Sequence, residues 1–335
     1  MRGRAGASPR AVGLDILLHD YFRSRCVQST PMKGAFVVFC LVVAALLWML
    51  GPAPAPDADA EATLILMEPE ITWQPERPGE GRLFRMRVIA SEHTPIMGVR
   101  GEVGSEELHF ERLDQRVFES LAAIPVGADS TVAAFVRVAY TAGGEETFEE
   151  RISITPGTYV HEELRVAPRF GAPLDSAARV RLAGDQEKAT EASRVAHRTP
   201  RLWRDAVIPR DTRVTSGFGD GRQFNGQISS RHMGLDLQGS RGDTVIAAAR
   251  GVVVLVEPFL LAGNIVYLNH GGGLLSAYFH LSEQLVAVGD TVEAGSAVGL
   301  IGATGRVTGP HLHWVVRYGR TSVDPRSLLE LPEPS

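Results

Sequence analysis

Two histidines separated by one residue, His311 and His313, stand in a run rich in Val and Trp near the end of the sequence. Such a run predicts a β-strand, and side chains two residues apart on a strand point to the same face. We therefore expect both imidazoles to project into one site. Alone, the pair is equally compatible with a solvated strand face.

Two other segments carry side chains of matching chemistry. His232 and Asp236 have three residues between them, and His280 lies in a separate strand-like run. Neutral imidazole and carboxylate groups both suit Zn²⁺, and a catalytic zinc ion typically takes three protein ligands and leaves a fourth position for water. His232, Asp236 and one histidine of the later pair would complete such a set, so the three segments together predict one metal site.

Composition bounds the class of protein. The chain has 335 residues, 44% of them hydrophobic and 22% charged, which leaves room for two domains and a tail. Its net charge of −5 gives no broad basic surface, so no nucleic-acid partner is expected. Both cysteines, Cys26 and Cys40, precede residue 50, so the rest of the chain has no disulfide and no thiolate metal site.

Residues 1–61 predict a tail with a signal or membrane anchor. Arginines are frequent before residue 32, residues 35–50 are apolar, and acidic residues follow residue 56. The apolar run is short for a membrane span and long for the apolar part of a signal peptide. This order of charges predicts that the remainder lies outside the cytoplasmic membrane. We expect a cell-envelope protein, in the periplasm or on the outer face of that membrane, which the segment contacts if it is not cleaved.

Residues 62–170 carry short strand patterns at regular spacing, punctuated by Pro-Gly and Gly-Gly turns. This pattern is typical of a β-sandwich of roughly immunoglobulin-like type. Three isolated histidines in this region have no partner at ligand spacing and are expected to be structural or solvated: His93, His109 and His161.

Residues 171–206 are highly charged and favour helix, so they predict a linker helix that ends at Thr199-Pro200. We expect His197 on that helix to be solvated.

Residues 207–335 are rich in strands and glycine. The tetrapeptide Gly-Asp-Thr-Val occurs at 242–245 and again at 289–292, which predicts a compact antiparallel sheet with two similar turns. Loops at 217–230 and 302–309 are expected to wall a groove beside the histidine strands. The predicted fold class is therefore mainly β throughout.

From Val214 to Leu329 the sequence resembles the lysostaphin/LytM-type zinc endopeptidases. The resemblance implies a small, mostly antiparallel β domain with an open groove that hydrolyses peptide cross-bridges or stem peptides of bacterial peptidoglycan. It rests on motifs in the same order: Gly217-Phe218-Gly219, His232-Met233-Gly234-Leu235-Asp236, Gly242-Asp243-Thr244-Val245, Asn269-His270-Gly271, Tyr278-Phe279-His280 and the run at 304–313 that ends in His311-Leu312-His313.

The resemblance also assigns roles to individual residues. His232, Asp236 and His313 match the family's ligands for one zinc ion per chain. His280 and His311 match its two catalytic histidines that are not ligands, and the sequence has no His-Glu-x-x-His motif to supply a glutamate base. The metal would polarise a water molecule and the two histidines would handle protons, in an order that stays open.

Three further positions have weaker assignments from the same resemblance. His270 matches a position that supports the sheet. Tyr278 either lines the groove or packs in the core, since it precedes His280 by two residues. Asn225 lies where some relatives place a residue that caps the zinc ion in a latent form.

Three other classes of protein share some of these sequence features. A non-catalytic scaffold or activator of other wall hydrolases would be expected to have lost ligands, and none is lost. A biotinyl or lipoyl carrier, which also has the repeated turn, needs a lysine, and no lysine follows Lys188. A D,D-carboxypeptidase of another fold fits the His232/Asp236 spacing less well. Envelope proteins are candidate partners of the sandwich.

Overall fold

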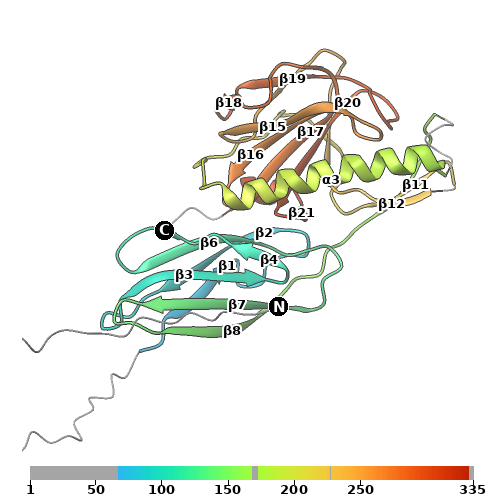
Figure 1. The fold of residues 1–335 in the computed structure, drawn as a ribbon. Helices are drawn as coiled ribbons and strands as arrows, with labels where there is room; N and C mark the ends of the chain where they lie inside the picture. Colours follow the sequence, from blue (N-terminus) through green and yellow to red (C-terminus); the bar gives the residue numbers. More distant parts are fainter. Residues whose placement is uncertain (1–66, 168–172, 227, 332–335) are drawn as a thin grey trace, which may run out of the picture. The chain divides into compact units, whose positions relative to one another are not determined.

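The computed structural model describes residues 67–167, 173–226 and 228–331, which belong to one compact unit, residues 65–335. The predicted N-terminal anchor lies outside the described residues. Among the residues described, no helix combines the length and apolar character that a membrane crossing requires. The prediction of a mainly β protein is confirmed, and Figure 1 shows one long helix, α3 (Ser176–Arg198), beside the strands.

The first half of the described chain forms two four-stranded antiparallel sheets. The first has the order β1-β2-β6-β5 and the second β4-β3-β7-β8. Alternate side chains of β2 and β7, such as Phe84 and Val136, are fully buried in one cluster that both sheets share. The strands are β1 (Glu70–Gln74), β2 (Leu83–Ile89), β3 (Ile96–Val103), β4 (Glu106–Leu108), β5 (Glu111–Arg112), β6 (Val117–Ala123), β7 (Thr131–Tyr140) and β8 (Glu145–Ser153).

The second half is built on a ten-stranded sheet, whose main path runs β10-β13-β20-β17-β16-β15-β18, with β14, β19 and β21 attached. A separate three-stranded sheet has the order β12-β11-β9. Its strands are β9 (His161–Leu164), β11 (Gly221–Phe224) and β12 (Ile228–Arg231). The large sheet contains β10 (Val214–Ser216), β13 (Leu235–Gln238), β14 (Thr244–Ile246), β15 (Gly251–Phe259), β16 (Gly263–Gly271), β17 (Leu274–Gln284), β18 (Thr291–Val292), β19 (Ala297–Ile301), β20 (His311–Tyr318) and β21 (Thr321–Val323), and a short helix follows, α4 (Arg326–Leu329).

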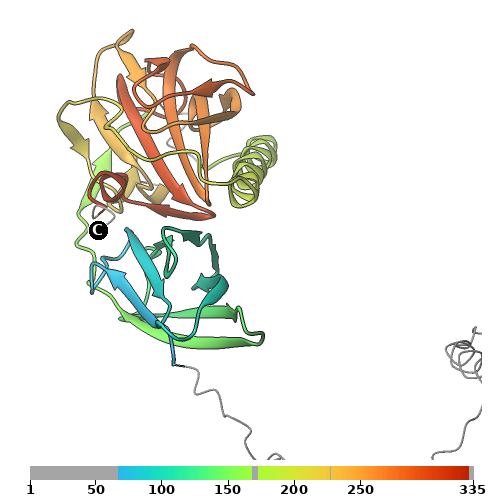
Figure 2. The ribbon, with the colours of Figure 1, turned by 90° about the vertical axis from the view of Figure 1, so that its left-hand side faces the viewer.

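The predicted linker helix forms as α3. The Asp175 carboxylate caps its first turn by accepting from the Ala178 backbone N–H at 2.8 Å, and the helix stops before Thr199-Pro200. Figure 2, a view nearly along the helix, shows α3 lying beside the sheet. Small residues on the face of α3 that is turned to the sheet allow this approach. Ala192 and Ala196 are buried there in the same cluster as side chains of β16, β17 and β20.

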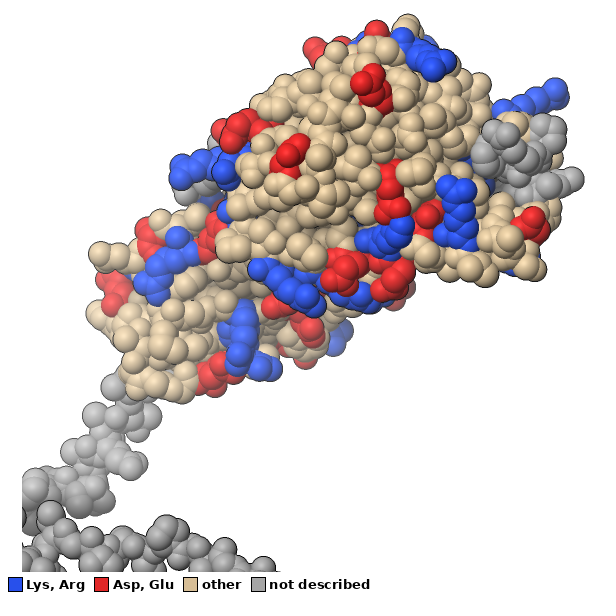
Figure 3. Space-filling model, turned by 45° about the horizontal axis from the view of Figure 1, so that its top comes forward, with Lys and Arg blue, Asp and Glu red and all other residues tan. Residues whose placement is uncertain are grey.

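The repeated Gly-Asp-Thr-Val turns are confirmed as a pair of similar entries into strands. Gly242 and Gly289 both have positive φ, 93° and 97°, a conformation that glycine adopts without steric cost. The first turn leads into β14, which pairs with β19, and the second into β18, which pairs with β15. On the face in Figure 3, basic and acidic side chains are interspersed among the other residues.

The expectation that His197 is solvated was wrong, whereas His109 has a structural role, one of the two expected for it. His109 and His197 are part-buried and their rings face one another, with Nε2 of His109 2.7 Å from Nδ1 of His197. The sequence separates them by 88 positions, so no local spacing could reveal the pair. His93 and His161 are exposed.

His270 supports the sheet, as the resemblance implied. Its side chain is completely buried, its Nδ1 donates to the Arg250 carbonyl at 2.9 Å, and its Nε2 accepts from the Ser276 hydroxyl at 2.8 Å. Burial lowers the pKa of His270 to about 4, and the bond to Arg250 offsets only part of that shift.

The burial of His270 predicts that the folded state loses stability in acid. Because the folded-state pKa lies below the ordinary value of 6.5, the unfolded chain takes up the proton first. The contribution is intact above pH 6.5 and is lost as pH falls towards 4, by about 3 kcal/mol. Denaturant unfolding at several pH values should show this loss in the wild type and a shallower slope in His270→Gln. Equal slopes in the two proteins would show that protonation of His270 does not cause the loss of stability.

Candidate metal centre

Strand register brings the first two site residues together. Asp236 in β13 lies directly opposite His313 in β20, and the antiparallel pairing places His311 opposite Gln238. Cross-strand neighbours on one face are close enough for direct contact. Nδ1 of His313 is 2.7 Å from Oδ1 of Asp236, and Nε2 of His311 is 3.6 Å from the same oxygen. His311 and His313 therefore share a face, as expected from their spacing.

His232 reaches the same oxygen from the loop that precedes β13. Its Nε2 is 3.0 Å from Oδ1 of Asp236 and 2.9 Å from Nδ1 of His313. Its other ring nitrogen, Nδ1, donates to the Gly217 carbonyl at 2.5 Å, which leaves the lone pair on Nε2. Three donor atoms from three segments thus converge in a buried position and form a group that could hold a metal ion.

The protonation states suit metal binding. Burial by itself would raise the pKa of Asp236, but the adjacent side chains of His232 and His313 hold it well below its usual range. Burial lowers the pKa of His313 to about 4, although Asp236 partly opposes this shift. At neutral pH the group therefore contains a carboxylate and a neutral imidazole, the forms in which these side chains bind metals.

His280 and His311 lie beside this group without joining it, with their ring centroids 5.1 Å apart. Nδ1 of His280 donates to the Thr304 carbonyl at 2.8 Å, and Nδ1 of His311 donates to the Gly309 carbonyl at 2.9 Å. Each ring therefore keeps a lone pair on Nε2. Burial, followed by the charges of the neighbouring histidines, places the pKa of His280 well below its ordinary value.

Tyr278 packs in the core and does not line the site. It is fully buried, and its hydroxyl accepts from the Ala248 backbone N–H at 2.7 Å. The two-residue alternation fails here because His280 has a left-handed φ of 63°, which turns the chain out of the regular strand. Phe279 lines the site instead, stacked on the His313 ring with centroids 5.2 Å apart.

Asn225 does not contact the metal-binding group. It occupies the turn between β11 and β12 with a φ of 50°, and its side-chain amide makes two hydrogen bonds to the backbone of Val166. Asn225 therefore does not fill the capping role that the resemblance offered as an option, because those two bonds hold its side chain on the segment that follows β9.

Arg222 is the site residue that sequence reasoning missed. It donates to Oδ2 of Asp236 at 2.5 Å and, through Nε, to Glu162 at 3.1 Å. Glu162 comes from β9, whose parallel register places it opposite Arg222 in β11. Arg222 therefore holds one carboxylate oxygen while the other faces the histidines. No local signal marks it, since the two partners lie 14 and 60 positions away.

Replacing Arg222 should weaken metal binding without removing any proposed ligand. Partners that orient a ligand typically account for about 10- to 100-fold in metal affinity. We expect Arg222→Ala to lose affinity in that range, measured by competition with a chelator, while the exposed Arg241→Ala serves as the control. An unchanged affinity in Arg222→Ala would show that Asp236 is oriented by the histidines alone.

Two cavities flank the metal-binding group, with volumes of about 290 and 430 Å³. Four residues line both of them: Arg222, Phe224, His280 and Arg306. The Arg306 guanidinium lies 4.1 Å from the centre of the Phe224 ring, so the two predicted loops meet beside the site. Both segments contribute walls, as expected, but 217–230 folds mainly as the hairpin of β11 and β12 and not as a loop.

Comparison with known proteins agrees with this geometry. Residues 230–325 match the model of Peptidase family M23. The peptidoglycan DD-endopeptidases ShyC and ShyA of Vibrio cholerae serotype O1 are 38% and 45% identical to this chain over 123 and 105 residues, which are 36% and 30% of this chain. The match spans only 28% and 24% of the length of those two proteins.

A crystal structure described as peptidase M23 from Pseudomonas aeruginosa is 26% identical, with a TM-score of 0.57, and the match covers 76% of this chain and 95% of that one. The likeness in fold therefore extends beyond the family-matched region into the sandwich. Residues 230–325 therefore match a domain of peptidase family M23, and their strand register and convergent His and Asp side chains agree with that match.

Proposed function

We propose that this protein is a zinc-dependent endopeptidase that hydrolyses peptide bonds of bacterial peptidoglycan, in its cross-links or stem peptides. The observation that carries the proposal is the convergence of His232, Asp236 and His313 on one buried point, with His280 and His311 beside it. The names of the matched Vibrio proteins, peptidoglycan DD-endopeptidases, support the same substrate class.

Zinc fits the donor set. Two neutral imidazoles and one carboxylate form a three-ligand site, which typically leaves a fourth position for water. A zinc ion held there supplies a Lewis acid that lowers the pKa of a bound water and polarises a carbonyl. Oδ1 of Asp236, Nε2 of His232 and Nδ1 of His313 would be the ligand atoms, since the other polar atoms of Asp236 and His232 already have protein partners.

His280 and His311 are the proposed proton carriers. Both keep an Nε2 lone pair because their Nδ1 atoms donate to backbone carbonyls. A neutral imidazole can accept a proton from the attacking water, and the resulting imidazolium can donate to the leaving amine. The low pKa of His280 keeps it neutral at physiological pH, so we assign it the role of proton acceptor. His311 would stabilise the oxyanion once protonated, because Nε2 then carries a hydrogen that it can donate.

The complete set of candidate ligands argues against a non-catalytic scaffold as the principal role. We propose that the chain works in the cell envelope, where its substrate lies, with residues 1–61 as a signal or anchor. Residues 62–170, 171–206 and 207–335 are the proposed sandwich, linker and peptidase regions.

We also infer that the sandwich is immunoglobulin-like. In that fold the first, second, fifth and fourth strands of the basic set form one sheet, and the third, sixth and seventh form the other. The sheets β1-β2-β6-β5 and β4-β3-β7-β8 match this order once β4 is taken as an added strand beside β3. Such a domain offers exposed strands for envelope partners.

Digestion of purified sacculi tests the proposed activity. The full chain should release muropeptides whose masses show a hydrolysed peptide bond, and a chelator should stop the release. The scissile bond follows from the fragments. Intact sacculi after incubation with zinc-loaded protein would exclude hydrolysis and favour the scaffold.

A further inference from the structure

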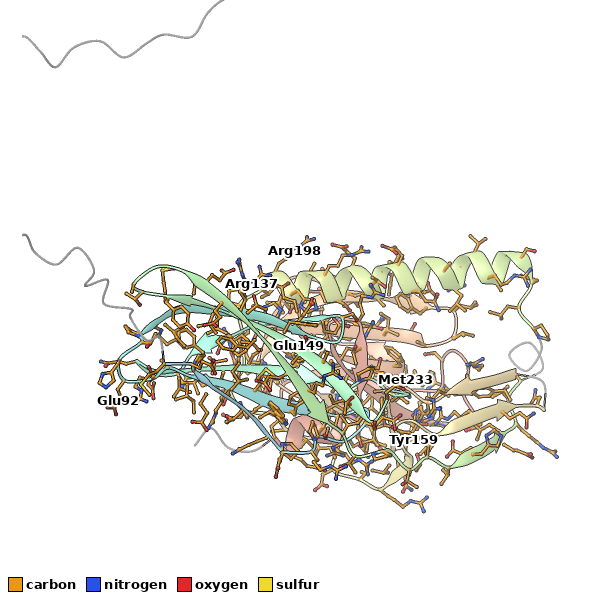
Figure 4. All side chains as sticks on the ribbon, turned by 90° about the horizontal axis from the view of Figure 1, so that it is seen from below. Glu92, Arg137, Glu149, Tyr159, Arg198 and Met233 are labelled. Carbon is orange, nitrogen blue, oxygen red and sulfur yellow. The ribbon has the colours of Figure 1, made fainter. Side chains whose placement is uncertain are left out.

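A second set of metal-ligand side chains lies where α3 meets β4, away from the site described above. Glu107 belongs to β4, His109 follows that strand, and His197 is in the last turn of α3, one residue before Arg198, which Figure 4 labels. Nε2 of His109 is 2.7 Å from Nδ1 of His197. One donor atom from each of the three residues lies within 4.8 Å of the others.

This geometry is comparable to that of the proposed catalytic group. There, Nε2 of His232 and Nδ1 of His313 are 2.9 Å apart. A tetrahedral zinc ion with Zn–N bonds of 2.0–2.1 Å holds two imidazole nitrogens about 3.3 Å apart. Both pairs of histidines would therefore open by roughly half an ångström on binding.

A buried carboxylate orients His197. Oε2 of Glu106 is 3.4 Å from Nε2 of His197, and its Oε1 accepts from the Arg320 backbone N–H and the Thr321 hydroxyl, each at 3.0 Å. Histidines that bind metals almost always donate their other ring N–H to such a group. The lone pair of His197 is thereby directed onto Nδ1, towards His109.

The space behind this carboxylate admits only glycine. A Cβ atom at Gly319 would lie 2.0 Å from Oε2 of Glu106 and 2.3 Å from Nε2 of His197. The backbone at Gly319 therefore packs directly against the Glu106–His197 pair and restricts its position, as expected for residues that orient a metal ligand.

The third residue of the set offers a carboxylate. Glu107 is exposed and supplies a carboxylate on the solvent side. That side leaves room for a water as a further ligand.

We propose that Glu107, His109 and His197 bind a second divalent transition-metal ion, zinc by its donor chemistry, which links the sandwich to α3. Two imidazoles and a carboxylate favour zinc over magnesium or calcium, which prefer oxygen ligands alone. The ion would stabilise the fold, because it binds ligands that only the folded chain brings together.

Metal content of the full chain, purified in detergent and dialysed against a low-zinc buffer, tests this site directly. Mass spectrometry should find two zinc ions per chain in the wild type and one in His109→Ala or His197→Ala. Glu106→Gln should bind the second ion about 10- to 100-fold more weakly, as expected for an orienting partner. The exposed His93→Ala is the matched control and should retain both ions.

Two comparisons separate this proposal from the catalytic one and from a loss of folding. His232→Ala should lose one ion while its thermal midpoint still rises with added zinc, and combining His197→Ala with it in one chain should abolish that rise. Glu107→Gln changes an exposed side chain and should keep the fold while losing the second ion. A wild-type content of one zinc that His109→Ala and Glu107→Gln leave unchanged would reduce the pair to an ordinary hydrogen bond between histidines.

Discussion

Replacing any of the three proposed ligands, His232, Asp236 or His313, should abolish both metal binding at the catalytic site and hydrolysis of sacculi. Asp236→Asn is the sharpest of these variants, because it keeps the shape of the side chain and removes the charge that offsets the metal. Removal of a ligand leaves two donors, too few to hold zinc against a chelator, and the water loses its activation. Zinc content and muropeptide release should be measured on the same preparations.

Two controls make the result specific. His93→Ala removes an exposed histidine of the sandwich and should change neither quantity. Circular dichroism must show a folded β protein for each ligand variant, since Asp236 also binds Arg222 and two histidines. Full activity in a folded variant that lacks zinc would end the metallopeptidase proposal.

Replacing His280 or His311 should separate proton transfer from metal binding. Neither side chain is among the three convergent donors, so alanine variants should retain the catalytic zinc ion. The rate of hydrolysis should still fall by about 10²- to 10⁴-fold, the range typical of a positioned general acid or base. Stopped assays of muropeptide release, with zinc measured in parallel, give both quantities.

The two histidines should also differ in their pH profiles. If His280 accepts the proton, its loss should remove the acid limb of the rate profile, while His311→Ala should lower the rate and keep the shape. His311 lies 3.6 Å from Oδ1 of Asp236, so this variant needs the zinc measurement most. Loss of zinc in His311→Ala with retention in His313→Ala would reverse the roles proposed for this pair.

Much of the site was predictable from sequence because its geometry is local or periodic. The i, i+2 rule placed His311 and His313 on one face of a strand, and chemical type joined them to His232 and Asp236. The repeated Gly-Asp-Thr-Val turns and the linker helix were predictable for the same reason, since glycine conformation and helix stops depend on neighbouring residues.

Tertiary structure decided the features that depend on distant partners or on one unusual backbone angle. The left-handed φ of His280 sends Tyr278 into the core and brings Phe279 to the site, against the simple alternation of a strand. Arg222 lies between Asp236 and Glu162, and the parallel pairing of β9 with β11 supplies the second of these partners. His109 and His197 meet only when α3 packs beside β4. Sequence alone thus determined which chemistry the site contains, because residue type and short spacing carry that information. The pairing of segments far apart in the chain decided which side chains orient the site. No short sequence spacing encodes that pairing.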